Sequence, residues 1–181
     1  MIDLRCKDLP QAIEVDGKSF LIKTDFRDWI TIADLFNKNS TLDKFTFIFK
    51  NNIPATSDFI QPLQQFLLNP NCTPKNDSAS NDRLLDYVLD GEYIYSAFMQ
   101  AYNIDLIDID YMHWHKFKAL VLGLPDDTML KCIMGYRGWR RDTTSYDTAC
   151  RRNRDAWKLP DNTIERDAEL LNDINKLFYN C

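Results

Sequence analysis

The stretch from Asp108 to Arg137 constrains the fold of this chain more than any other. Apolar residues recur in it at steps of three and four, the spacing of one helical face, at Trp114, Phe117, Leu120, Val121 and Leu124. Gly123 stands where a left-handed residue would end this helix, and Pro125 cannot continue it. We therefore expect a helix, a Gly-Leu-Pro corner and a second short helix, packed as a hairpin at the centre of the fold.

Acidic and hydroxyl residues stand where both helices would begin. Asp108 or Asp110 can cap the first, because a short carboxylate accepts hydrogen bonds from the free backbone N–H groups of a helix start. The second helix would start at Asp126, Asp127 and Thr128, and would turn inward the apolar residues Leu130, Ile133 and Met134.

The N-terminal third begins with a hairpin pattern. Asp16-Gly17, between the apolar runs of residues 13–22, can take the positive φ angles of a type I′ turn. Thr24 or Asp25 then caps a helix with an apolar stripe at Phe26, Trp29, Ile30, Ala33 and Phe36. Residues Thr41–Asn51 fit a strand by the alternation of their phenylalanines and a helix by other spacings, and their Thr-Leu-Asp-Lys start favours the helix.

Further helices follow along the chain. One begins near Ser57 and carries Phe59, Ile60, Leu63, Phe66 and Leu67, with Pro62 tolerable only in or near its first turn. Pro70–Asn81 is polar and contains two prolines and three asparagines, which predicts a surface loop or linker. The longest helix is expected from about Asp86 to Tyr102, ended by a left-handed Asn103, and an amphipathic last helix opens at Asp161.

These elements predict a mainly α fold of about six or seven helices with one short N-terminal β-hairpin. Residues 1–69 would form the hairpin and a helical unit, residues 70–82 a polar linker, and residues 83–181 the central and C-terminal helical unit, within one compact domain. The 181 residues and the 45% apolar content are sufficient for a real core.

The composition indicates the cellular compartment in which the protein folds. The five cysteines (Cys6, Cys72, Cys132, Cys150 and Cys181) are scattered and never spaced as CxxC, as in proteins of a reducing cytoplasm. No stretch approaches the ~18 apolar residues that span a membrane. We expect a soluble cytoplasmic protein.

No residue pattern predicts an enzyme, a cofactor or a metal. His113 and His115 lie two residues apart, on different sides of a helix, which favours packing or surface roles over shared metal ligation. The carboxylates of Asp105, Asp108 and Asp110, and those of Asp126-Asp127, stand beside expected helix starts, where capping explains them better than acid–base chemistry.

A basic segment interrupts this acidic chain. Residues Lys131–Lys158 contain eight Lys or Arg against three Asp, which is +5 in a chain of net charge −5. Arginine and tryptophan are typical of protein interfaces, so we select as a candidate interface Arg137, Trp139, Arg140, Arg141, Arg151, Arg152, Arg154 and Trp157. A solvated surface, contact between copies of the chain and a nucleic-acid groove are alternatives, and Arg137 can equally cap the short helix that it ends.

Three stretches in colinear order resemble the bacteriophage "gene product fifteen" family. They are Val15-Asp16-Gly17-Lys18 leading to Thr24-Asp25-Phe26-Arg27, Ile94-Tyr95-Ser96-Ala97-Phe98 followed by Tyr102-Asn103-Ile104-Asp105-Leu106, and His113-Trp114-His115-Lys116-Phe117-Lys118-Ala119-Leu120 with Gly123–Thr128 and Ile133–Arg137. Together they anchor the resemblance over roughly Val15 to Trp157.

The family's genes lie in tail-gene clusters, usually just before the tape-measure gene, where tail assembly chaperones are encoded. The resemblance therefore implies a chaperone that binds the tape-measure protein and tail-tube subunits, with homo-oligomerisation to coat a long client. The alternative is a tail-completion or connector subunit that stays in the virion. A chaperone would need apolar grooves for client helices, for which Trp114, Phe117, Trp139 and Trp157 are the expected contacts, although Trp114 and Phe117 fit the core better than a groove.

Overall fold

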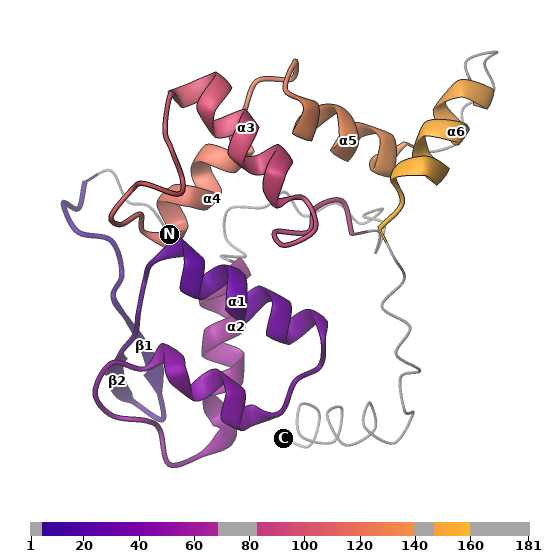
Figure 1. Cartoon of the computed structure of the whole chain (residues 1–181). Helices are drawn as coiled ribbons and strands as arrows, with labels where there is room; N and C mark the ends of the chain where they lie inside the picture. Colours follow the sequence, from indigo (N-terminus) through magenta and orange to yellow (C-terminus); the bar gives the residue numbers. More distant parts are fainter. Residues whose placement is uncertain (1–4, 69–82, 140–146, 160–181) are drawn as a thin grey trace.

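The computed structural model describes residues 5–68, 83–139 and 147–159. Its N-terminal part consists of β1 (Ala12–Val15), β2 (Lys18–Leu21), α1 (Phe26–Asn37), the 3₁₀ helices η1 (Leu42–Ile48) and η2 (Ser57–Phe59), and α2 (Ile60–Leu68). The second part consists of α3 (Gly91–Tyr102), α4 (Trp114–Leu122), α5 (Met129–Gly138) and α6 (Asp147–Trp157). The fold is mainly α with one N-terminal hairpin, which confirms the predicted class (Figure 1).

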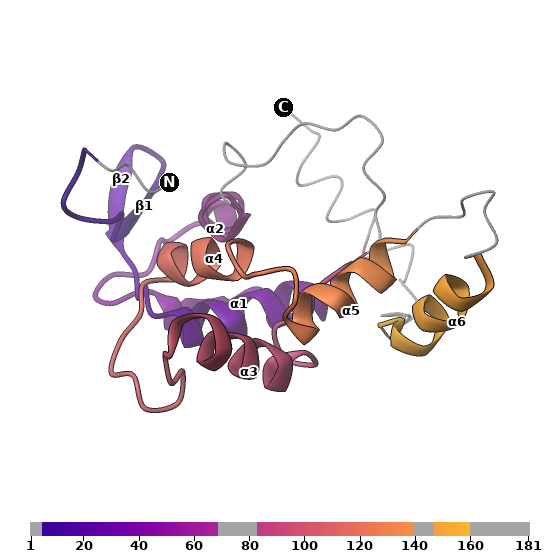
Figure 2. The same cartoon turned by 90° about the horizontal axis from the view of Figure 1, so that it is seen from above.

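The central helix is α4. Figure 2 shows it between α2 on one side and α1 and α3 on the other, with the hairpin and α6 at opposite ends of the molecule. The ring of Phe117 is stacked on those of Phe26 from α1, at 4.7 Å, and Phe98 from α3, at 5.3 Å. Trp114 and Phe117 are 1% and 0% exposed, so both are core residues, and the predicted central position of this helix is confirmed.

Side chains of α4 also bind the end of α2. The last carbonyl groups of a helix lack partners within the helix, and here three of them accept from α4. His115 Nε2 donates to Phe66 O at 3.1 Å, Trp114 Nε1 donates to Leu67 O at 3.1 Å, and Lys118 Nζ donates to Leu68 O at 2.7 Å. The sequence Trp114–Lys118 therefore joins the two helices through polar bonds in addition to apolar packing.

The hairpin forms as its turn residues predict. Asp16 and Gly17 have φ angles of 51° and 71°, and Val15 pairs with Lys18 across the turn. Asp25 caps α1, because its side chain accepts from Arg27 N at 3.0 Å. Residues 42–48 are a 3₁₀ helix, which agrees with the preference for helix, while Phe49 is extended and bridges Ile22.

Several predicted helix ends are wrong. His113, and neither Asp108 nor Asp110, is the N-cap of α4, since its imidazole accepts from His115 N at 3.1 Å. Gly123 ends α4 with a φ of −83°, so no left-handed residue is used there.

The start of α3 also differs from the prediction. This helix begins at Gly91 instead of Asp86, because residues 86–90 form a separate turn in which the Asp86 carboxylate accepts from the backbone of Val88 and Leu89. At its other end Asn103 is left-handed, as predicted, with a φ of 52°. The predicted Pro70–Asn81 loop and the last helix from Asp161 lie outside the described residues.

A candidate partner-binding groove

An apolar groove lies between α1, α3 and the loop that leads from α3 to α4. Its volume is about 390 Å³. The walls are formed by Phe26 and Ile30 of α1, by Ile94 and Tyr95 of α3, and by Leu106 and Ile107 of the loop. The buried ring of Phe117 on α4 forms the floor. A groove of this composition suits an apolar surface of a partner.

The loop wall is held in place by Arg27. Its guanidinium Nη2 donates to three backbone carbonyls, those of Leu106 at 3.0 Å, Ile107 at 3.4 Å and Ile109 at 2.7 Å. The same group lies 4.7 Å from the centroid of the Phe26 ring. Ile107 is 75% exposed on this loop, so a large apolar side chain is fixed at the rim without being covered. Such a residue marks a contact site when it adjoins an apolar groove.

The rim carries carboxylates. Glu92 is among the residues that line the groove. Beside it, Tyr95 donates its hydroxyl proton to Asp105 Oδ2 at 3.1 Å. Hydrogen bonds from the backbone N–H groups of Ile107 and Asp108, and from Tyr95, hold the pKa of Asp105 below its usual value, so this carboxylate is ionised at neutral pH. The hydrogen bond to Asp105, together with the negative field of Asp105 and Asp108, in turn raises the pKa of Tyr95.

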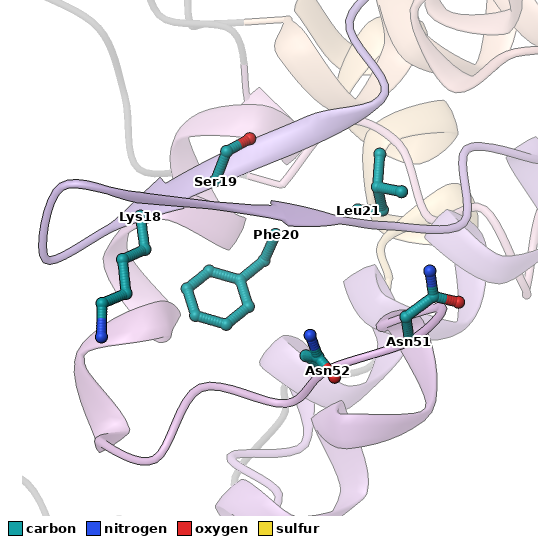
Figure 3. A pocket seen from close by; sticks show the side chains of 6 residues that line it. All are labelled: Lys18, Ser19, Phe20, Leu21, Asn51 and Asn52. Carbon is teal, nitrogen blue, oxygen red and sulfur yellow. The ribbon is translucent and has the colours of Figure 1, made fainter.

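A second, smaller hollow of about 240 Å³ lies beside β2. It is lined by Lys18, Ser19, Phe20, Leu21, Asn51 and Asn52. Figure 3 shows the side chains of Lys18 and Phe20 turned toward the segment that carries the two asparagines. The surface is smaller and more polar than the groove, which makes the groove the better candidate site.

The predicted basic interface is described only in part. Arg151, Arg152 and Arg154 are exposed on α6, and Trp139 is half-buried. Trp157 is also half-buried, because its ring packs edge-on against Tyr93 of α3 with centroids 5.7 Å apart. Arg140 and Arg141 lie outside the described residues.

Arg137 must be removed from the candidate interface. Only 8% of it is exposed, and its guanidinium forms two hydrogen bonds with the buried carboxylate of Asp90, at 2.6 Å and 2.8 Å. It also donates to Leu84 O at 3.0 Å and to Trp157 O at 2.8 Å. Arg137 therefore connects α5 with the start of α3 and the end of α6 inside the protein, and a surface partner cannot reach it.

Sequence reasoning missed both Asp90 and the groove. Asp90 lies within residues 86–102, which were expected to form one helix, and a carboxylate on a helix is usually a solvated surface residue. The sequence feature that pointed to such a partner was Arg137, which follows apolar residues of a helix. If the fold buries Arg137, its charge requires a buried anion nearby. The groove depends on the approach of the loop to α1, for which no local pattern exists. Of the expected groove contacts, Phe117 forms its floor and Trp114 belongs to the core.

Both histidines are buried packing residues. His113 and His115 are 5% and 4% exposed. Nδ1 of His113 accepts from His115 N, so its Nε2 carries the proton and donates to Pro10 O at 2.9 Å. Burial lowers the pKa of His113, and it lowers the pKa of His115 to about 4. Both rings are therefore neutral at pH 7.

None of the helices in the described ranges is long and apolar enough to cross a membrane. Comparison with protein families gives a match to the family described as "Bacteriophage Gp15 protein", over residues 6–159. This range contains the three stretches that carry the resemblance noted in the sequence. The comparisons with curated proteins and with solved structures each gave no significant match.

Proposed function

This chain belongs to the Bacteriophage Gp15 protein family, which supports a structural or morphogenetic role in a phage, and we propose that it is a tail assembly chaperone. It binds amphipathic helices of the tape-measure protein and presents them to tail-tube subunits. The protein acts by binding and performs no chemical step.

The groove between α1 and α3 is the observation that carries the proposal. A tape-measure protein is long and helical, and its apolar stripes need cover before the tail tube surrounds them. A helix can place apolar side chains from successive turns between the two walls and over Phe117. Ile107, 75% exposed at the rim, adds apolar area to this contact.

Co-expression with fragments of the tape-measure protein from the same gene cluster tests the proposal. We expect a fragment to become soluble and to co-purify with the chain. Ile107→Ser should reduce the recovered complex several-fold, because it removes apolar area at the rim. Ile53→Ser is the matched control, since Ile53 is also exposed, at 56%, but does not line the groove.

The alternative is a structural subunit of the tail. It is favoured if every tape-measure fragment stays insoluble and mass spectrometry finds the chain at fixed copy number in finished particles. Equal loss of complex in both serine variants would show that the groove is not the binding surface.

A further inference from the structure

We propose that the groove selects helices whose apolar stripe is flanked by lysine or arginine. This inference rests on the groove that carries the proposed function, and it names the chemistry of the occupant.

The first step is the polarity of the groove itself. Aromatic and aliphatic side chains form both walls and the floor, so only an apolar stripe can fill the centre without leaving polar groups unpaired. Charge recognition must therefore take place at the rim, on the side chains that flank the stripe.

The second step is the charge of that rim. Glu92 is exposed on α3, and Asp108 is exposed on the loop. Asp105 belongs to the same loop, bonded to the hydroxyl of Tyr95 and kept ionised by the backbone of Ile107 and Asp108.

The third step concerns Arg27, the cation at this rim. One side of its guanidinium faces the carboxylate of Asp25, with Nη1 3.4 Å from Oδ1. Its Nη2 donates to three carbonyls of the loop. The positive charge is thus largely compensated by groups of this chain, and the rim as a whole presents a negative field to a partner.

The fourth step is reach. Lysine and arginine place their methylene stems on apolar surface while their charged ends extend outward. On a helix in the groove, such a stem can cover Ile107 and bring its charge near Asp108 or Glu92. Glutamate at the same position would place like charges together, which weakens binding.

Two stapled model peptides test the inference directly with the full chain. Both have about 18 residues, roughly 27 Å of helix, and the same leucine stripe, flanked by lysines in one and by glutamates in the other. We expect the lysine peptide to bind about tenfold more tightly at low salt, since each rim ion pair contributes a modest amount. The difference should shrink at about 1 M salt, where the Debye length is about 3 Å.

Matched charge variants separate the rim from the net charge of the protein. Glu92→Gln with Asp108→Asn should reduce the preference for lysine several-fold. Asp126→Asn with Asp127→Asn removes the same charge from exposed residues before α5 and should leave the preference nearly unchanged. Equal effects of the two pairs, or equal affinity for the two peptides, would overturn the inference.

The two proposals fail separately. If a tape-measure fragment binds in an Ile107-dependent manner but the peptides do not differ, the charge selection is wrong and the chaperone role stands. If the lysine peptide binds in the groove while no tape-measure fragment does, the selection stands and the client is a different protein.

Discussion

Asp25 and His113 lie opposite each other in an antiparallel bridge, and each caps the helix that follows it. Phe26 N donates to Met112 O at 2.9 Å and Trp114 N donates to Thr24 O at 2.8 Å, so α1 and α4 start side by side. The Asp25 carboxylate also accepts from Met112 N at 3.3 Å. Two of the three stretches that carry the resemblance to the family meet at this bridge, which fixes the floor of the groove relative to one wall.

Replacement of His113 tests the capping. His113→Ala removes the acceptor for His115 N and the donor to Pro10 O, and we expect a loss of about 2 kcal/mol in the free energy of unfolding. His113→Asn retains a side-chain acceptor at the cap and should lose less. Urea denaturation of both variants checks this, and equal losses would show that packing of the ring, not capping, is what matters.

Acid should destabilise the protein through His115. Burial lowers its pKa from 6.5 to about 4. Between pH 6.5 and 4, His115 is therefore protonated in the unfolded chain and neutral in the folded chain, so acid favours unfolding. The contribution of His115 to the free energy of unfolding is fully present above pH 6.5 and is lost as the pH decreases toward 4. The total loss from this group is about 3 kcal/mol, because each unit of difference between its folded and unfolded pKa values corresponds to about 1.4 kcal/mol. His113 acts in the same direction. Denaturation at several pH values should give a shallower decrease for His115→Gln, and an unchanged slope would contradict this assignment.

The buried pair of Arg137 and Asp90 should dominate the stability of the second half. Arg137→Met leaves the Asp90 carboxylate, 2% exposed, without its cation, and we expect a loss of about 3–5 kcal/mol. Arg151→Met on the exposed surface of α6 is the control, with an expected change of about 0.5 kcal/mol or less. The double variant with Asp90→Asn should regain part of the loss. Chemical denaturation measures the double variant, the two single variants Arg137→Met and Asp90→Asn, and the Arg151→Met control. Additive effects of Arg137→Met and Asp90→Asn would show that the two residues do not interact.

Local sequence patterns predicted the secondary-structure elements and most of the core. The features that were not predicted depend on polar contacts between residues far apart in the sequence. The hairpin turn, the cap at Asp25 and the left-handed Asn103 each depend on a few neighbouring residues, and all three are as predicted. The cap of α4 was missed because aspartate is the commoner capping residue, whereas His113 can cap only with its Nδ1 unprotonated, a state that burial and Pro10 favour. The partner of Arg137 lies 47 positions away in the chain, beyond any helical or strand period.

Gly17 should be the glycine that tolerates a side chain least. It has a φ of 71°, while no atom of the described residues, apart from Gly17 itself and its two chain neighbours, lies within 4 Å of the position that a Cβ would take there. The cost of Gly17→Ala is therefore conformational, about 1 kcal/mol. Gly91→Ala is the control, because its site is equally open and lies in the first turn of α3 with no positive φ. Thermal unfolding should show a lower midpoint for Gly17→Ala alone. Equal midpoints would mean that the hairpin turn rearranges without cost.

Arg27 should determine how firmly the groove wall is held. Arg27→Lys keeps a charge near Asp25, but one ammonium group cannot reproduce a guanidinium that binds three carbonyls of residues 106–109 while lying over Phe26. Asp105 still accepts from Ile107 N at 2.8 Å and from Asp108 N at 3.2 Å, so the loop should loosen without unfolding. We expect backbone hydrogen exchange in residues 106–109 to rise about tenfold, the effect of losing about 1.4 kcal/mol of local stability, and binding of tape-measure fragments to weaken. Arg154→Lys on the exposed surface of α6 should change neither quantity. Unchanged exchange in Arg27→Lys would assign the order of the loop to Asp105, and the wall of the groove would then be independent of α1.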